Sequence, residues 1–156
     1  MPAAEIEIRV FDPLAAAPEE WARFHIFRRA RHQEHRPDDP IFPDDLAETQ
    51  MKTDAGHPDY FERQFIAVRG DAIVGSSFVA WTTEHAPGYA PDKHTAYVGA
   101  GVLRAERRRG IGTRLFRDAV ALTDPARHTV LSTPTDEDDG HVFLQHLGFA
   151  ERSKGA

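Results

Sequence analysis

The sequence predicts a mixed α/β (α+β) domain with a mostly antiparallel sheet, one βαβ crossover and flanking helices. Three observations support this class. Apolar and charged residues alternate at residues 6–10, as in a strand with one buried face. Apolar residues recur at helical spacing in later segments. A short strand, an amphipathic helix and another short strand then follow one another, which is the pattern of a parallel crossover.

The first half of the chain is expected to contain one strand and two helices. The strand covers residues 6–10. The first helix begins at Pro18, because proline and the two glutamates after it suit the first turn of a helix, and it ends before Pro37. A weaker helix covers about residues 44–53. The apolar stripe of the first helix indicates that it packs on the sheet.

Three strands are predicted next. Residues 65–68 and 73–81 form a hairpin, and residues 96–103 form a third strand after a loop. Gly99 and Gly101 lie inside this third strand. Glycine in a strand indicates a bulge or the close approach of another group to the backbone.

The crossover helix is predicted at residues 111–122, where apolar residues recur every three or four positions. A short buried strand follows at residues 129–132. A late helix is expected at residues 142–147, and a last strand begins at Phe149. Because a crossover helix joins parallel strands, the strand at residues 129–132 should run parallel to the strand at residues 96–103.

Composition limits the classes of function. The chain has 156 residues, a net charge of −6 and no cysteine, so we expect one domain over residues 1–156 without disulfides or thiolate sites. The negative charge does not favour nucleic acid or anionic membranes as partners. The N-terminal residues do not resemble a secretory signal, so a cytoplasmic location is expected. Arginines surround His32 and His35, so no metal site is expected.

A basic, glycine-containing loop carries the most informative pattern. Residues 104–113 follow the strand predicted at residues 96–103 and lead into the crossover helix. The first N–H groups of a helix lack internal partners and attract phosphate. Gly110 and Gly112 leave room for a pyrophosphate to reach them, while Ile111 anchors the turn in the core. The arginines at 107–109 add attraction for a polyanion.

This loop resembles a known family. Residues 107–112 (RRRGIG) match the R/Q-x-x-G-x-G/A loop that binds acyl-CoA in the GNAT acyltransferases, the GCN5-related N-acetyltransferases. Residues 143–149 (FLQHLGF) are similar to the late helix of that family, usually F-Y-x-x-x-G-F. The order of elements also fits over nearly the whole chain. The resemblance implies a GNAT-like sheet whose strands splay apart at the cofactor site.

The resemblance also implies the cofactor site. Acetyl-CoA would be the cosubstrate, with its pantetheine arm along the backbone of residues 102–104 and its pyrophosphate on the amides of residues 107–113. The expected cofactor-binding residues are Val102, Leu103, Arg104, Arg107, Arg108, Arg109, Gly110, Ile111, Gly112, Thr113 and Phe143. The implied reaction is the direct attack of a primary amine, from a small molecule or a peptide, on the thioester.

The sequence offers several candidates for the general acid that protonates the thiolate and for the general base that deprotonates the amine. The tyrosine that usually protonates the thiolate in this family is replaced by Leu144, which leaves Ser132, Thr133 and His141 as neighbouring candidates for the acid. The strand before the loop has no acidic residue. The expected catalytic residues are therefore Glu84 and His85, at the end of the preceding strand, with His94 and Tyr97 as further possibilities for the base.

Two alternatives stay open at this point. The chain could be a noncatalytic acyl-CoA-binding module or one degenerate half of a tandem GNAT protein, because Leu144 lacks a donor and only seven residues follow Phe149. The family usually closes its sheet with two strands there, so we expect a shortened C-terminal strand pair. An exposed sheet edge would favour a homodimer. RNA binding by the arginine loop is disfavoured because no aromatic residues are interleaved with it.

Overall fold

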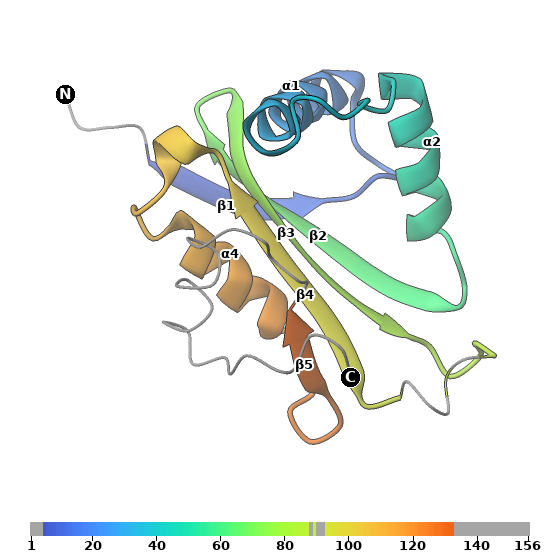
Figure 1. Cartoon of the computed structure of the whole chain (residues 1–156). Coiled ribbons are helices and arrows are strands. Elements are labelled where there is room, and N and C mark those ends of the chain that lie inside the picture. The colour runs from blue at the N-terminus through green and yellow to red at the C-terminus, as the bar shows by residue number, and fades with distance from the viewer. Residues whose placement is uncertain (1–4, 88, 90–92, 133–156) are drawn as a thin grey trace.

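The computed structural model describes residues 5–87, 89 and 93–132 (Figure 1). The predicted late helix and the strand after it, including Phe143 and Leu144, lie outside these residues. In chain order the elements are β1 (Ile6–Phe11), α1 (Pro18–His35), α2 (Asp44–Ala55), β2 (Tyr60–Arg69), β3 (Ala72–Thr82), β4 (Thr95–Val102), the 3-10 turn η1 (Arg104–Glu106), α4 (Ile111–Val120) and β5 (Thr129–Ser132).

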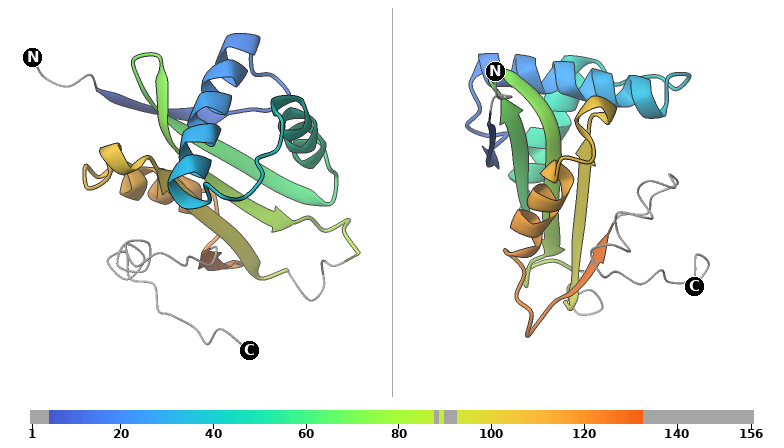
Figure 2. Two further views of the ribbon diagram at one scale, coloured as in Figure 1. Left: turned by 45° about the horizontal axis from the view of Figure 1, so that its top comes forward. Right: turned by 90° about the vertical axis from the view of Figure 1, so that its left-hand side faces the viewer.

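The described strands form one five-stranded sheet in the order β1-β2-β3-β4-β5. The first four strands are antiparallel neighbours, and β5 pairs with β4 in parallel after the α4 crossover, as the sequence predicts. This parallel pairing joins Thr95–Val98 to Thr129–Ser132. The right-hand view of Figure 2 shows β5 beside the lower end of β4, after the crossover through α4. The mixed fold class predicted from the sequence is therefore confirmed.

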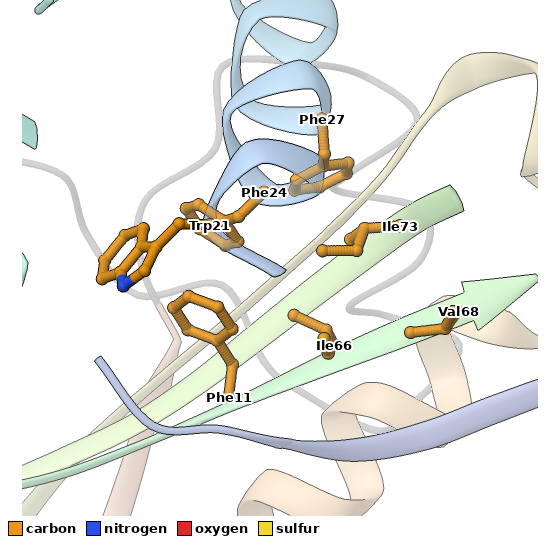
Figure 3. Packing of buried hydrophobic residues seen from close by; sticks show 7 residues of the cluster. All are labelled: Phe11, Trp21, Phe24, Phe27, Ile66, Val68 and Ile73. Atoms are coloured by element: carbon orange, nitrogen blue, oxygen red, sulfur yellow. The ribbon is translucent and has the colours of Figure 1, made fainter. Parts of the chain in front are cut away.

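One face of the sheet is covered by α1 and α2. Phe11 of β1 stacks on Phe24 of α1 with ring centroids 4.7 Å apart, and Trp21 meets Phe11 edge-on at 5.0 Å. Ile66 and Ile73 of the sheet complete this cluster, together with Phe27 and Val68 (Figure 3). Aromatic side chains bury large apolar areas. This cluster therefore fixes the position of α1 on the sheet.

The opposite face is covered by α4. Leu115 is fully buried with Val74 and Val102, and Phe116 packs with Val98. In β4, Val102 thus faces α4, whereas Leu103 just after the strand packs against the α1 cluster. Because side chains alternate along a strand, Tyr97, Gly99 and Gly101 lie on the α1 face.

Element boundaries differ from the predictions at three places. The strand β2 begins at Tyr60 rather than Phe65, because the added residues are half-exposed and mostly polar and so lack the apolar signal. The helix α4 ends at Val120, with Leu122 left 38% exposed. The pairing of β3 with β4 is continuous past Gly99 and Gly101, so the predicted bulge is absent from that pairing. The register shift lies instead in the pairing of β2 with β3, where Ala67 and Val68 are opposite Gly75 and Ile73 and Val74 is the extra residue.

Candidate functional site

The start of α4 presents open main-chain donors. Gly110 is the N-cap residue with φ of 79°, a conformation that costs little only for glycine. Among the described residues, a β-carbon added to Gly110 would meet no heavy atom within 4 Å. No side chain of this part of the chain caps the helix. Within the described part of the chain the first amides of α4 therefore have no side-chain partner, which suits the anion site that the sequence predicts at this junction.

The arginines of the loop have different surroundings. Arg108 is exposed and has φ of 65°. Arg109 is also exposed, and its Nη1 lies 3.8 Å from Glu106, which is held by Arg69 of β2 at 2.6 Å. Arg107 turns inward, and its Nε donates to the carbonyl oxygen of Val102 over 3.2 Å. The loop is thus tied to the sheet through Glu106 and Arg107.

The edge of β4 beyond its pairing with β5 is the second part of the site. The amide of Leu103 donates to the carbonyl oxygen of Val74 over 3.0 Å, and that of Arg104 donates to the carboxylate of Glu34 over 3.2 Å. Because peptide groups alternate in direction along a strand, that of Val102 points away from β3. Of the three residues expected to meet the pantetheine arm, only Val102 thus has its backbone groups on the outer edge, and its carbonyl oxygen there accepts from Arg107 and Arg31.

Arg31 of α1, one of the arginines around His32 and His35, lies directly over this part of β4. A β-carbon at Gly101 would lie 2.7 Å from Nη2 of Arg31, so a larger residue there would displace the guanidinium from its present position. Arg31 Nη1 also donates to the carbonyl oxygen of Val102 over 3.4 Å and to His35. Glycine inside a predicted strand was the available signal, and it marks a close approach rather than a bulge.

Positive charge is concentrated at this place. Burial lowers the pKa of Arg31, and so do Arg107 and Arg104, while Glu34 raises it. The pKa of His35 is lowered, first by burial and then by the same three arginines. Arg107 Nη2 lies 3.3 Å from His35 Nε2. We call Arg31, His35, Arg104 and Arg107 the cationic cluster.

The lowered pKa of His35 predicts a pH effect on stability. As the pH falls below the ordinary histidine value of 6.5, the unfolded chain binds a proton before the folded one does, so folding stability decreases. His35→Gln removes this contribution. We expect the free energy of unfolding to fall less in His35→Gln than in the wild type between about pH 7 and pH 5. Urea denaturation at several pH values measures it, and identical slopes would contradict the assignment.

The predicted catalytic residues lie at the far end of β4. Glu84 and His85 are exposed in the turn after β3, which pairs with the beginning of β4. They are separated from the Gly110 turn by the length of β4, about 25 Å for an eight-residue strand. His94 Nδ1 lies 3.1 Å from the carbonyl oxygen of Arg127. Ser132 pairs through its backbone with Val98, and Thr133 and His141 lie outside the described residues.

An acidic residue that sequence reasoning missed lies on the α1 face. Glu62 of β2 is opposite Ala80 of β3, which is opposite Tyr97 of β4, so the three form one row across the sheet. Gln64 donates to Oε1 of Glu62 over 3.0 Å. The sequence prediction started β2 at Phe65, so Glu62 was not placed on the sheet at all.

Comparison with known proteins identifies the family. The model of the acetyltransferase (GNAT) family matches residues 19–149, which is most of the chain. The chain belongs to the GNAT family. The match spans β4, the Gly110 turn and α4, and so includes the open donors described above. Among the curated proteins, none matches this GNAT chain significantly in sequence.

Solved structures share the fold. The aminoglycoside N-acetyltransferase AAC(6')-Iy in complex with CoA has 16% identity and a TM-score of 0.68, covering 99% of this chain and 94% of its own. A metagenomic soil aminoglycoside acetyltransferase bound to sisomicin has 13% identity and a TM-score of 0.67, with coverages of 97% and 93%. A predicted acetyltransferase from Clostridium acetobutylicum with acetyl-CoA has 15% identity and a TM-score of 0.68, with coverages of 97% and 94%.

The described residues hold neither a helix of membrane-spanning character nor a cluster of metal-ligating side chains. Within residues 5–87, 89 and 93–132, no helix combines the length and the apolarity needed to cross a bilayer. In the same part of the chain, no three histidine or acidic side chains converge as metal ligands would. His32 and His35 have separate partners, since His32 Nε2 lies 2.7 Å from the carbonyl oxygen of Asp39 and His35 contacts Arg31.

Proposed function

We propose that this GNAT chain is an N-acetyltransferase that transfers the acetyl group of acetyl-CoA to a primary amine by direct attack. The observation that carries the proposal is the uncapped N-terminus of α4 beside the outer edge of β4, within the segment that matches the family. Main-chain amides there suit a pyrophosphate. The named acetyltransferases with this fold include structures with CoA, acetyl-CoA and an aminoglycoside, which supports an amine acceptor.

The proposed reaction needs three contributions from the protein. A neutral amine attacks the thioester carbonyl carbon, so that a C–N bond forms while the C–S bond breaks. A base takes a proton from the amine, and the departing thiolate takes up a proton. Glu84 and His85 stay the candidates from the sequence, and Glu62 with Tyr97 is a second candidate pair on the α1 face. The outer edge of β4 would hold the pantetheine arm of acetyl-CoA so that its thioester faces the attacking amine.

Turnover is the deciding test. Purified protein is incubated with acetyl-CoA and a panel of primary amines, and released CoA is measured with a thiol reagent, with which a chain without cysteine does not react. We expect release with at least one primary amine and none with matched tertiary amines. Tight binding of acetyl-CoA without release for any amine would instead support a noncatalytic acyl-CoA-binding module. The absence of both binding and release would refute the proposal.

A further inference from the structure

We propose that the acceptor amine carries a carboxylate and that Arg31, at the centre of the cationic cluster, binds this carboxylate beside the acyl-CoA arm. This inference rests on the proposed acetyltransferase function and specifies the class of its substrate. The observation behind it is the guanidinium of Arg31, which lies in contact with the backbone of Gly101 at the outer end of β4.

Arg31 differs from the other arginines of its helix. Arg23, Arg28 and Arg29 each have a carboxylate oxygen within 4 Å, from Asp71 or Asp44. In the part of the chain that the structure describes, no carboxylate lies within 4 Å of Arg31, although the chain as a whole has an excess of acidic residues. A half-buried guanidinium is expected to have an anionic partner, since desolvating an unpaired charge is costly.

The neighbours of Arg31 increase the positive potential. Arg104 and Arg107 both act on it electrostatically, and burial together with these charges lowers its pKa. The carboxylate of Glu34 is bonded to the amide of Arg104, and the Glu34 carbonyl oxygen accepts a bond from the Arg104 side chain. The Glu34 carboxylate is therefore bonded to the amide of Arg104 rather than to the guanidinium of Arg31. A planar guanidinium matches a carboxylate in geometry as well as in charge.

The face of the sheet favours the acceptor as the source of the anion. The α4 face of β4 is filled by buried side chains, including Val98 and Val102 under Leu115 and Phe116. Gly101 and Tyr97 lie on the other face, together with Arg31, and Tyr97 is 39% exposed. An acceptor that approaches an acyl group on the edge of β4 would thus come from the α1 face, where Tyr97 is partly exposed. Its carboxylate would lie on Arg31 while its amine lies further along β4 toward Tyr97.

The test uses pairs of acceptors that differ only in charge. Glycine, β-alanine, 4-aminobutyrate and 6-aminohexanoate are each compared with the corresponding carboxamide, and kcat/KM is measured for the wild type and for Arg31→Gln. Comparing the two proteins cancels the different intrinsic reactivities of an acid and its amide. We expect the preference for the acid over the amide to fall by about ten- to a hundredfold in Arg31→Gln, which corresponds to one charge-assisted hydrogen-bonded contact.

Two further variants separate a specific contact from general charge. Arg31→Lys keeps the positive charge but lacks the planar guanidinium. We expect it to retain more of the preference for the acid over the amide than Arg31→Gln does. Arg36→Gln removes the same charge from an exposed position just after α1 and should change the preference by less than about twofold. The binding of N-acetyl-β-alanine and its carboxamide to the CoA-bound protein, measured by calorimetry, gives a readout that needs no turnover.

Each result has a defined meaning. Loss of the acid preference in Arg31→Gln with an unchanged dissociation constant for acetyl-CoA supports the proposal. A weaker affinity for acetyl-CoA with an unchanged acid preference would assign Arg31 to a phosphate of the cosubstrate and overturn it. Equal use of acids and amides by the wild type, in turnover and in product binding, would also overturn it while leaving the acetyltransferase function intact. Failure of the wild type to bind acetyl-CoA would refute the proposed function itself.

Discussion

Replacement of Gly112 by valine is expected to raise the dissociation constant for acetyl-CoA by at least about a hundredfold while the domain stays folded. Gly112 is the second residue of α4, so its amide is among the first donors of the helix. Side chains on a helix point toward its N-terminus. A branched side chain at this position would therefore cover the amides that a pyrophosphate must reach.

Folding and binding can be separated at this position. Valine has a higher helix propensity than glycine, so the backbone of α4 should tolerate the change. Gly112→Ala adds only a methyl group, and the loop pattern of the family allows glycine or alanine there, so this variant should retain most of its affinity. Arg108→Ala alters an exposed side chain and should change the affinity by less than about tenfold, because the main chain makes the contact.

Calorimetry with acetyl-CoA and a thermal melt of each variant provide the measurement. Unchanged affinity in folded Gly112→Val would mean that the pyrophosphate does not lie on the first turn of α4. A similar loss in Arg108→Ala would mean that the arginine side chains, rather than the amides, hold the cosubstrate. Either result would remove the main support for the proposed function.

Local patterns were sufficient to predict most of the fold. The boundaries of α1 follow from Pro18 and Pro37, and the crossover follows from the order of a strand, a glycine-rich turn and an amphipathic helix. The sequence places Gly110 at the start of the helix, where the structure has it as the N-cap residue, and its φ of 79° is a further reason for glycine there. These features depend on residues that are close in sequence, so the sequence alone contains the signal.

The contacts between distant segments could not be predicted in the same way. Glu34 and Arg104 are 70 residues apart, and Arg31 and Val102 are 71 apart. Nothing in a local pattern says which charged residue of α1 faces β4, since the helix carries arginines on several sides. Glu62 was missed for a different reason: the polar start of β2 lacks the alternation that marks a strand with one buried face.

The aromatic cluster beneath α1 is expected to give the largest loss of stability in the described part of the chain. Phe11 is 1% exposed and contacts both Trp21 and Phe24. Phe11→Ala should lower the free energy of unfolding by about 3–5 kcal/mol, since it removes a buried ring and leaves a cavity. For a domain of this size, the melting temperature should fall by on the order of 10 °C. Urea denaturation measures the change directly.

Val10 supplies a matched control on the same strand. It is 44% exposed, so Val10→Ala should cost less than about 1 kcal/mol. A comparable loss in both variants would mean that β1 as a whole, rather than the packing of α1 on Phe11, sets the stability. The packing of α1 on Phe11 matters for function, because α1 positions Arg31 beside Gly101 and Glu34 beside Arg104. If Phe11 fixes α1 on the sheet, Phe11→Ala should also weaken the selection for carboxylate-bearing acceptors at temperatures where the domain is still folded.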